Sequence, residues 1–303
     1  MNLFSKIFGC FRRSPVSESE AQIRRDLLTA VDITRLPPAV GFLRDIQLAD
    51  VELLRETMRV AKLVGVHPWM IGGGLIGMLR HGGRFIPWDD DLDLVLIREE
   101  YERFVDLFNA NCRPGFRAYY KYHGKFCRIK VAHQDLPDSV DLSIFVFDRF
   151  WKALPQLADK RAFRARIDRV QDQIKHRARG LDVAAHRRLF DEFRARDVLE
   201  GHPPAPDSER PALFFGAELR VFRFVTSIIY DYEDVYPLRP GEFEGVEVLL
   251  PNRGENILTY MYGNWGAFPN SLCNHHRSSE FSVEKALALR RFLTTSTAAT
   301  GNP

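Results

Sequence analysis

A run of acidic residues that leads into a hydrophobic strand sets the strongest limit on the fold of this chain. Residues 87–96 read Pro-Trp-Asp-Asp-Asp-Leu-Asp-Leu-Val-Leu, and the leucines alternate with other residues as in a strand with one buried face. On such a strand Asp89, Asp91 and Asp93 point to the same side, where their carboxylates repel one another. The run therefore indicates either a divalent-cation site or a solvated acidic turn before an edge strand.

A glycine triplet lies upstream of the acidic run. Residues 69–71 (Trp-Met-Ile) are predicted to form a short strand, residues 72–74 a glycine turn, and residues 75–80 a helix. A glycine turn between a strand and a helix lets backbone N–H groups approach a phosphate. A glycine triplet alone is more often only a tight turn. Glycines followed by Asp91-Leu92-Asp93 resemble the nucleotidyltransferase superfamily pattern, which favours a phosphate and metal site.

Two longer segments carry a more specific resemblance. Residues 77–93 read Gly-Met-Leu-Arg-His-Gly-Gly-Arg-Phe-Ile-Pro-Trp-Asp-Asp-Asp-Leu-Asp and resemble the signature of the LicD/fukutin family. Residues 243–269, with Phe-Glu-Gly, Tyr-Gly-x-Trp and a following proline, resemble the C-terminal half of that family. The resemblance covers roughly residues 69–269, with little support in the middle. Departures from the family pattern at Gly74, Met78 and residues 142–145 concern the donor and acceptor more than metal binding.

The resemblance implies a fold and a reaction. The expected fold is of the α+β class: a nucleotidyltransferase-like mixed β-sheet flanked by helices, with a helical insertion and a helical C-terminal region. The expected reaction moves a phosphocholine-like or polyol-phosphate group from a CDP-activated donor to a saccharide hydroxyl and releases CMP. Mg²⁺ is the expected cofactor, with Mn²⁺ as a substitute, because hard cations prefer oxygen ligands. The expected partners are a CDP-activated alcohol and a saccharide or glycolipid acceptor.

The same resemblance assigns roles to particular residues. Asp91, Asp93 and Asp141 are the expected catalytic and metal-binding carboxylates, with Asp89 as a further metal ligand. Asp141 is the only acid within a strand predicted over residues 139–147, although a solvated aspartate near a turn is the plain alternative. Asp141 is the first candidate for the general base and Asp89 the second. The residues expected to bind the donor are Gly73, Gly74, Arg80, His81, Arg84 and Lys130.

One large domain is predicted over residues 17–294, with a helical insertion at about 150–230 and a disordered tail at 295–303. Residues 1–16 are predicted to form an amphipathic or disordered tail. Apolar side chains share one helical face within residues 1–13, so peripheral membrane contact is as well supported there as a disordered or docked segment. Further helices are predicted over 17–33, 46–64, 98–108 and 217–229, and further strands over 116–120 and 126–132.

Composition narrows the function classes. The chain has 303 residues, of which 45% are hydrophobic and 27% charged, as in an ordinary soluble globular protein. The net charge of +3 is too balanced to indicate nucleic-acid binding. Four cysteines without metal-ligand spacing suit a reducing compartment, so we expect a cytoplasmic protein. Residues 1–13 leave open whether it is also peripheral at the inner face of the cytoplasmic membrane. Two alternatives stay open: an NTP-dependent nucleotidyltransferase and a catalytically inactive nucleotide-binding scaffold.

Overall fold

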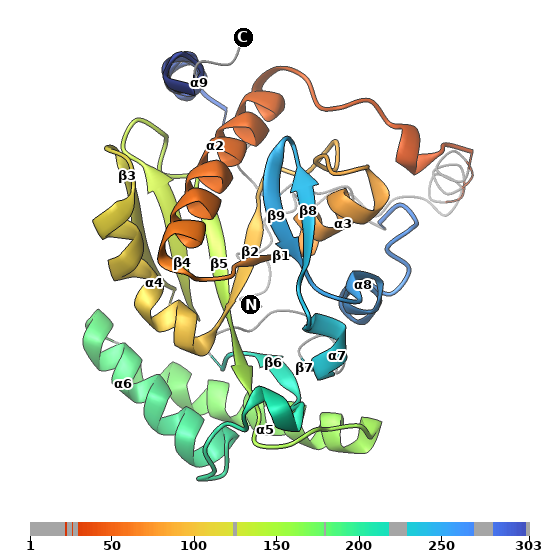
Figure 1. Ribbon diagram of the computed structural model, residues 1–303, viewed down its shortest axis with the longest axis vertical. Helices are drawn as coiled ribbons and strands as arrows, with labels where there is room; N and C mark the ends of the chain where they lie inside the picture. The colour runs from red at the N-terminus through yellow and green to blue at the C-terminus, as the bar shows by residue number, and fades with distance from the viewer. Residues whose placement is uncertain are drawn as a thin grey trace.

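The structure is a computed structural model that describes residues 22, 26, 30–123, 126–178, 180–217, 229–269 and 281–300. These residues form a mixed β-sheet flanked by helices, which confirms the predicted α+β class (Figure 1). The strands are β1 (Trp69–Ile71), β2 (Asp93–Ile97), β3 (Phe116–His123), β4 (Phe126–His133), β5 (Leu142–Arg149), β6 (Leu213–Phe215), β7 (Ile229–Tyr230), β8 (Arg239–Phe243) and β9 (Val246–Leu250). The helices are α2 (Gly41–Val64), α3 (Gly72–Arg80), α4 (Arg98–Asn111), α5 (Leu157–Arg177), α6 (Val183–Phe193), α7 (Tyr232–Val235), α8 (Gly254–Tyr262) and α9 (Val283–Thr300), with 3-10 turns at Ile33–Arg35 and Asp207–Glu209 and a π-helical turn at Arg194–Val198.

The strand order places β2 and β5 at the centre of the sheet. The order is β3-β4-β5-β2-β1-β9-β8, and β6 pairs with β5 and with β7. β2 runs parallel to β5, and β1 runs parallel to β9, whereas the other neighbours are antiparallel. Asp93 is level with Ser143 in the β2–β5 register. The N-terminal ends of these two central strands therefore meet at the same edge of the sheet.

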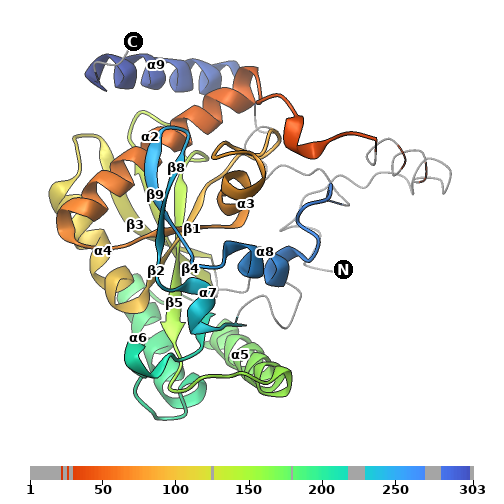
Figure 2. The ribbon, with the colours of Figure 1, turned by 45° about the vertical axis from the view of Figure 1, so that its right-hand side comes forward.

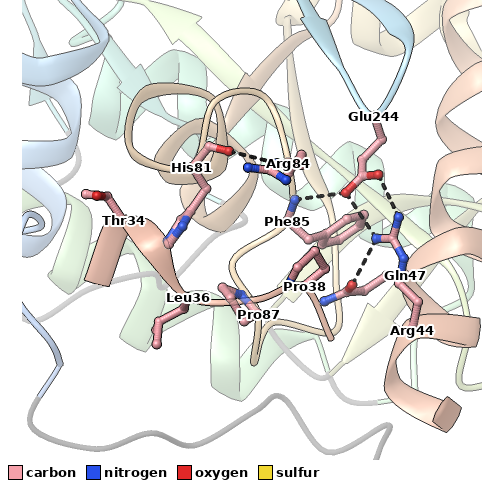
Figure 3. Close-up of a pocket in the computed structure, with 10 residues that line it drawn as sticks. All are labelled: Thr34, Leu36, Pro38, Arg44, Gln47, His81, Arg84, Phe85, Pro87 and Glu244. Atoms are coloured by element: carbon pink, nitrogen blue, oxygen red, sulfur yellow. Dashed lines mark hydrogen bonds and ion pairs between the residues drawn. The ribbon is translucent and has the colours of Figure 1, made fainter. Parts of the chain in front are cut away.

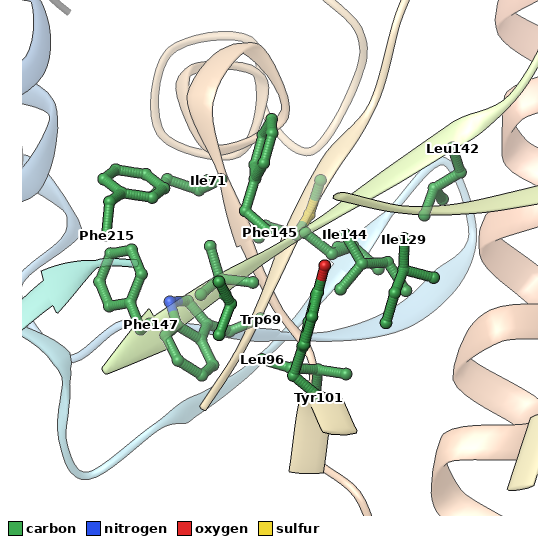
Figure 4. Packing of buried hydrophobic residues seen from close by; sticks show 14 of the residues in the cluster. Trp69, Ile71, Leu96, Tyr101, Ile129, Leu142, Ile144, Phe145, Phe147 and Phe215 are labelled. Atoms are coloured by element: carbon green, nitrogen blue, oxygen red, sulfur yellow. The ribbon is translucent and has the colours of Figure 1, made fainter. Parts of the chain in front are cut away.

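One face of the sheet is apolar and is covered by α2 and α4. Leu94, Leu96, Ile129 and Ile144 on this face are completely buried, and Figure 4 shows Leu96, Ile129 and Ile144 close to Tyr101 of α4. α2 ends at Gly65, which adopts the left-handed conformation at φ +67° that glycine tolerates best. The alternation read from the sequence thus positions the sheet against its two long helices.

The opposite face carries a group of aromatic rings in contact with one another. Phe147 contacts Trp69 and Phe215 edge to face and stacks on Tyr230, with ring centroids 4.5–5.5 Å apart. Figure 4 shows Trp69, Phe147 and Phe215 close together. α3 and α8 lie on this side, away from α2 and α4 (Figure 2). The aromatic rings fill this face near the ends of β2 and β5. The part of the face near the start of β2 carries polar residues.

Several expectations need correction. The insertion at 150–230 contains α5 and α6 but also β6 and β7, which extend the sheet beyond β5; strands of two or three residues are too short for periodicity to reveal. The tail predicted to be disordered from residue 295 instead continues α9 through Thr300, and α9 packs on α2, where Arg290 pairs with Asp45 at 3.3 Å. Residues 1–16 and most of the helix predicted over 217–229 lie outside the described residues. Within the described ranges, no helix combines the length and apolar character needed to cross a membrane.

Candidate functional site

The glycine triplet lies against the acidic run. α3 begins at Gly72 itself, so the three glycines form the first turn of the helix and not a loop before it. A Cβ atom at Gly73 would lie 1.9 Å from Asp89 Oδ2, and one at Gly72 would lie 3.4 Å from Asp93 Oδ2. Gly72 also has a φ of +63°. Glycine is favoured at position 73 because the Asp89 carboxylate approaches the backbone closely, and at position 72 because the backbone there is left-handed.

The start of α3 also offers hydrogen-bond donors. The first amides of a helix have no partner within the helix, and they attract anions such as phosphate. The backbone amides of Gly72 and Gly73, which have no acceptor within the helix, therefore lie beside the acids. Gly74 is different, because a Cβ there would meet Met70 Cε at 2.5 Å and Leu92 Cδ2 at 3.2 Å. The absence of a side chain at Gly74 is thus explained by packing against the core.

The acids are placed differently from the predicted strand. β2 begins only at Asp93, so Asp89, Asp90 and Asp91 precede the strand. Asp89 and Asp90 are buried, and Asp91 and Asp93 are half-buried. Burial, reinforced by the charges of Asp91, Asp90 and Asp93, raises the pKa of Asp89 well above its ordinary value. Carboxylates that crowd together in this way create a negative potential suited to a divalent cation.

Asp141 lies at the same edge of the sheet but has lysine partners. β5 begins at Leu142, so Asp141 immediately precedes the strand in which it was predicted. Since Asp93 is level with Ser143, Asp141 lies at the edge of the sheet where β2 also begins. The buried Asp141 carboxylate accepts a hydrogen bond from Lys130 Nζ at 2.5 Å and lies 3.5 Å from Lys121 Nζ. Lys130 Nζ also donates to Ser143 Oγ at 2.6 Å, so this buried lysine ties Asp141 to β5.

The three basic residues of the signature divide into two groups. Arg80 donates to the backbone oxygen of Trp265 and lies over the Trp88 ring, 5.9 Å from its centroid. Burial lowers the pKa of Arg80 to about 10, although the nearby Asp89 acts in the opposite direction. Burial and the charges of Arg80 and Arg84 lower the pKa of His81 to about 4, so this ring is neutral at pH 7. Arg84 is exposed, and with His81 it lines the pocket in Figure 3, whose lining includes none of the aspartates of the acidic run.

Two residues near the acids were not predicted. Tyr262 at the end of α8 places its hydroxyl 3.6 Å from the Cβ position of Gly72, although 40% of the residue is exposed. Burial of the hydroxyl and the charges of Asp93, Asp89 and Asp91 raise the pKa of Tyr262. Its Tyr-Gly-x-Trp motif was a signal that could have identified it. Gln47 in α2 is fully buried and donates to the backbone oxygen of Asp89 at 2.8 Å, but nothing in the local sequence of a helix marks it.

The donor set suits a hard cation. Asp89, Asp91 and Asp93 supply carboxylate oxygens of the kind that Mg²⁺ prefers. Burial, together with the charges of Asp91, Asp90 and Asp93, raises the pKa of Asp89, as expected where like charges lie close together. In the described part of the chain, no three His, Cys, Asp or Glu side chains converge closely enough to hold a metal ion as they stand. Metal binding by Asp91, Asp93 and Asp141 therefore stays a prediction.

Comparison with known proteins identifies the region that contains most of this site. Residues 65–174 match the family model described as LicD/FKTN/FKRP, nucleotidyltransferase domain. The chain is 30% identical over 118 residues to the lipopolysaccharide cholinephosphotransferase LicD of Haemophilus influenzae, which is 35% of this chain and 44% of that protein. It is 34% identical over 91 residues to the ribitol 5-phosphate transferase FKRP of mouse and of human, which is 27% of this chain and 18% of each relative. The matches thus span less than half of these relatives.

The matched region begins just before β1 and extends into α5, so it includes the glycine start of α3, the acidic run and Asp141. Tyr262 and Glu244 lie outside it, on the C-terminal elements that pack against α3 and its following loop. The range matched by the family model includes the signature in residues 77–93. Residues 65–174 therefore match the nucleotidyltransferase domain of the LicD/fukutin family.

Proposed function

We propose that this protein moves a phosphocholine-like or polyol-phosphate group from a CDP-activated donor to a saccharide hydroxyl and releases CMP. The observation that carries the proposal is the contact between two acids, Asp89 and Asp93, and the glycines that begin α3. This contact joins the carboxylates that suit a cation to the amides that suit a phosphate. The relatives, a lipopolysaccharide cholinephosphotransferase and a ribitol 5-phosphate transferase, support transfer of an alcohol phosphate onto a glycan.

Side chains of the chain itself would bind and orient the donor. Mg²⁺ or Mn²⁺ held by Asp91 and Asp93, with Asp89 or Asp141, would neutralise a diphosphate and favour departure of CMP. The amides of Gly72 and Gly73 would bind a phosphate oxygen. Phosphoryl transfer depends mainly on positioning and charge stabilisation, so no covalent intermediate with the protein is needed.

The acceptor hydroxyl must lose a proton as it attacks. Asp141 and Asp89 are the two candidates for this step. The raised pKa of Asp89 brings it closer to the range in which a carboxylate accepts a proton efficiently at neutral pH. Asp141 instead lies between Lys130 and Lys121, whose charges stabilise its anionic form and weaken it as a base. We therefore place Asp89 before Asp141 as the proton acceptor, which reverses the order expected from the sequence.

The test is a product analysis. The protein is incubated with Mg²⁺, a panel of CDP-alcohols and saccharide acceptors, and CMP release is measured with and without EDTA. We expect CMP from at least one donor, dependent on both the divalent cation and Asp93. Release of pyrophosphate from an NTP in place of CMP would overturn the proposal in favour of nucleotidyl transfer. No turnover with any donor, together with a thermal shift by Mg²⁺ plus CDP or CTP, would favour a catalytically inactive nucleotide-binding scaffold.

A further inference from the structure

We infer that Glu244, with Arg44 and Gln47, is a positioning residue that holds the loop carrying the acidic run in its active place. Glu244 lies in the turn between β8 and β9, far from the loop in sequence, and it is not among the residues that we assign to the donor or the cation. The inference deepens the proposed function, and it rests on that function for its activity measurement only.

The Glu244 side chain binds the signature loop and α2 at once. Its Oε1 accepts a hydrogen bond from the backbone N–H of Phe85 at 3.2 Å (Figure 3). The same carboxylate receives two hydrogen bonds from the Arg44 guanidinium, at 3.0 Å to Oε1 and 2.8 Å to Oε2. Only 11% of the Glu244 side chain is exposed. A two-pronged arginine–carboxylate pair fixes direction as well as distance, so the turn and α2 hold Phe85 between them.

Backbone contacts reinforce the attachment. The N–H of Glu244 donates to the oxygen of Gly83 at 2.8 Å. A Cβ atom at Gly83 would lie 2.5 Å from the backbone oxygen of Glu242, so the loop approaches the hairpin too closely for a larger residue. The hairpin therefore contacts the loop twice: its main chain binds Gly83, and the Glu244 side chain binds the backbone of Phe85.

The network continues from Arg44 to the acids. Arg44 Nη1 donates to Gln47 Oε1 at 3.2 Å. Gln47 Nε2 in turn donates to the backbone oxygens of Asp89 at 2.8 Å and Ile86 at 3.3 Å. An unbroken line of hydrogen bonds thus joins the β8–β9 turn to the main chain of Asp89. Asp89 and Asp93 lie against the start of α3, so a displacement of this loop moves them relative to the glycine amides.

The backbone conformation at Glu244 indicates that its side-chain contacts, and not the turn, explain the presence of a glutamate. Phe243 pairs with Val246, so Glu244 and Gly245 form a two-residue turn, and both have positive φ, +48° and +76°. Asn, Asp and Gly are the residues that such a turn favours at its first position, because other side chains crowd the backbone there. Glutamate is a poor choice for the turn itself. Its presence is explained by the contacts that its longer carboxylate makes with Phe85 and Arg44.

This conflict gives a variant series in which turn preference and positioning predict opposite orders. Glu244→Asn suits the turn better but cannot reach Phe85 and Arg44. Glu244→Gln keeps the length and one acceptor oxygen for Phe85 but loses the charge that binds Arg44. Glu247→Gln, in β9, is the matched control, because Glu247 is 88% exposed and pairs only loosely with Lys62 at 3.5 Å.

Amide hydrogen exchange, followed by mass spectrometry on the full chain, reports on the loop without any substrate. We expect Glu244→Asn to speed exchange in peptides covering residues 82–90 by at least tenfold while β4 exchanges as in the wild type. Glu244→Gln should lie between wild type and Glu244→Asn, and Glu247→Gln should match the wild type. CMP release should fall in the same order, by tenfold or more for Glu244→Asn, mainly in kcat, with a melting temperature within a few degrees of the wild type.

Other results would overturn the inference. Wild-type exchange and turnover in Glu244→Asn would show that Glu244 is only a turn residue. Faster exchange throughout the chain in both variants, with a collapse of the melting temperature, would show a general structural role. If the wild type releases no CMP from any donor, the proposed function fails, while exchange at residues 82–90 still decides the role of Glu244.

Discussion

Two buried aspartates at opposite ends of the central strands have opposite electrostatic surroundings. Asp89 lies before β2, at the edge where β2 and β5 begin, and Asp148 lies near the end of β5. Burial would raise the pKa of Asp148, but Arg98 at 2.7 Å and Arg194 at 3.5 Å overcome it and lower that pKa. Burial raises the pKa of Asp89, and the neighbouring acids raise it further.

The comparison distinguishes a carboxylate that stabilises the fold from one that serves a ligand. Asp148 joins β5 to α4 and to the π-helical turn through two arginines, so its charge is neutralised within the protein. Asp89 instead has three acids, Asp91, Asp90 and Asp93, among its charged neighbours, although Arg80 also lies near it. A fold that keeps like charges this close does so at a cost in stability, and a bound cation is the simplest way to recover it.

The largest expected effect is on catalysis by the acids at the edge where β2 and β5 begin. Asp93→Ala should lower CMP release by about a thousandfold or more, equivalent to roughly 4 kcal/mol of transition-state stabilisation, because a ligand oxygen of the proposed cation site is lost. The melting temperature should stay within a few degrees of the wild type, since like-charge repulsion is relieved. Turnover near the wild-type rate would remove Asp93 from the site.

The second largest effect is on stability, at Asp148 and its arginine partners. Asp148→Ala should lower the free energy of unfolding by about 3 kcal/mol, because it leaves the largely buried Arg98 guanidinium without its main partner. Urea denaturation measures this change, and the exposed Glu247→Gln variant serves as its control. If Asp148→Ala were as stable as the wild type, the contrast between the two ends would not reflect charge compensation.

Binding of Mg²⁺ and CDP should stabilise the protein only when the acids near the start of β2 are intact. Mg²⁺ with CDP, each at about 100 times its dissociation constant, should stabilise the wild type by ~2.7 kcal/mol for a single linked site. The same additions should leave the melting temperature of Asp93→Ala unchanged. An equal thermal shift in wild type and Asp93→Ala would place the ligand away from the acids.

The smallest effect is a gain in stability at the acidic end. Because the pKa of folded Asp89 is raised, the native state holds a proton that the unfolded state has lost between the ordinary value of 3.8 and the raised value. Stability therefore falls as pH rises through this window. Asp89→Asn should abolish that fall and gain about 1 kcal/mol or more at pH 7, visible as a flatter plot of melting temperature against pH. A steeper plot would mean that the Asp89 carboxylate is stabilising.

Local patterns predicted much of this fold. Helical spacing identified residues 46–64 and 98–108, which lie within α2 and α4 as observed, and alternation identified the hydrophobic parts of β2 and β5. The strand starts were less accurate, since Asp91 and Asp141 precede β2 and β5 rather than lying within them. An aspartate next to an alternating hydrophobic segment can be the first residue of the strand or the last residue before it. Only the backbone pairing in the structure distinguishes these two cases.

The sequence by itself determined the acidic run, the glycines beside it and the resemblance to the LicD/fukutin family, because these residues lie within a few positions of one another and their chemistry is local. Only the tertiary structure decided that Lys130 neutralises Asp141, that Tyr262 reaches Gly72, and that Glu244 binds the amide of Phe85, 159 residues away. Contacts of this kind depend on sheet order and helix packing, which bring together segments whose own periodicities contain no information about each other.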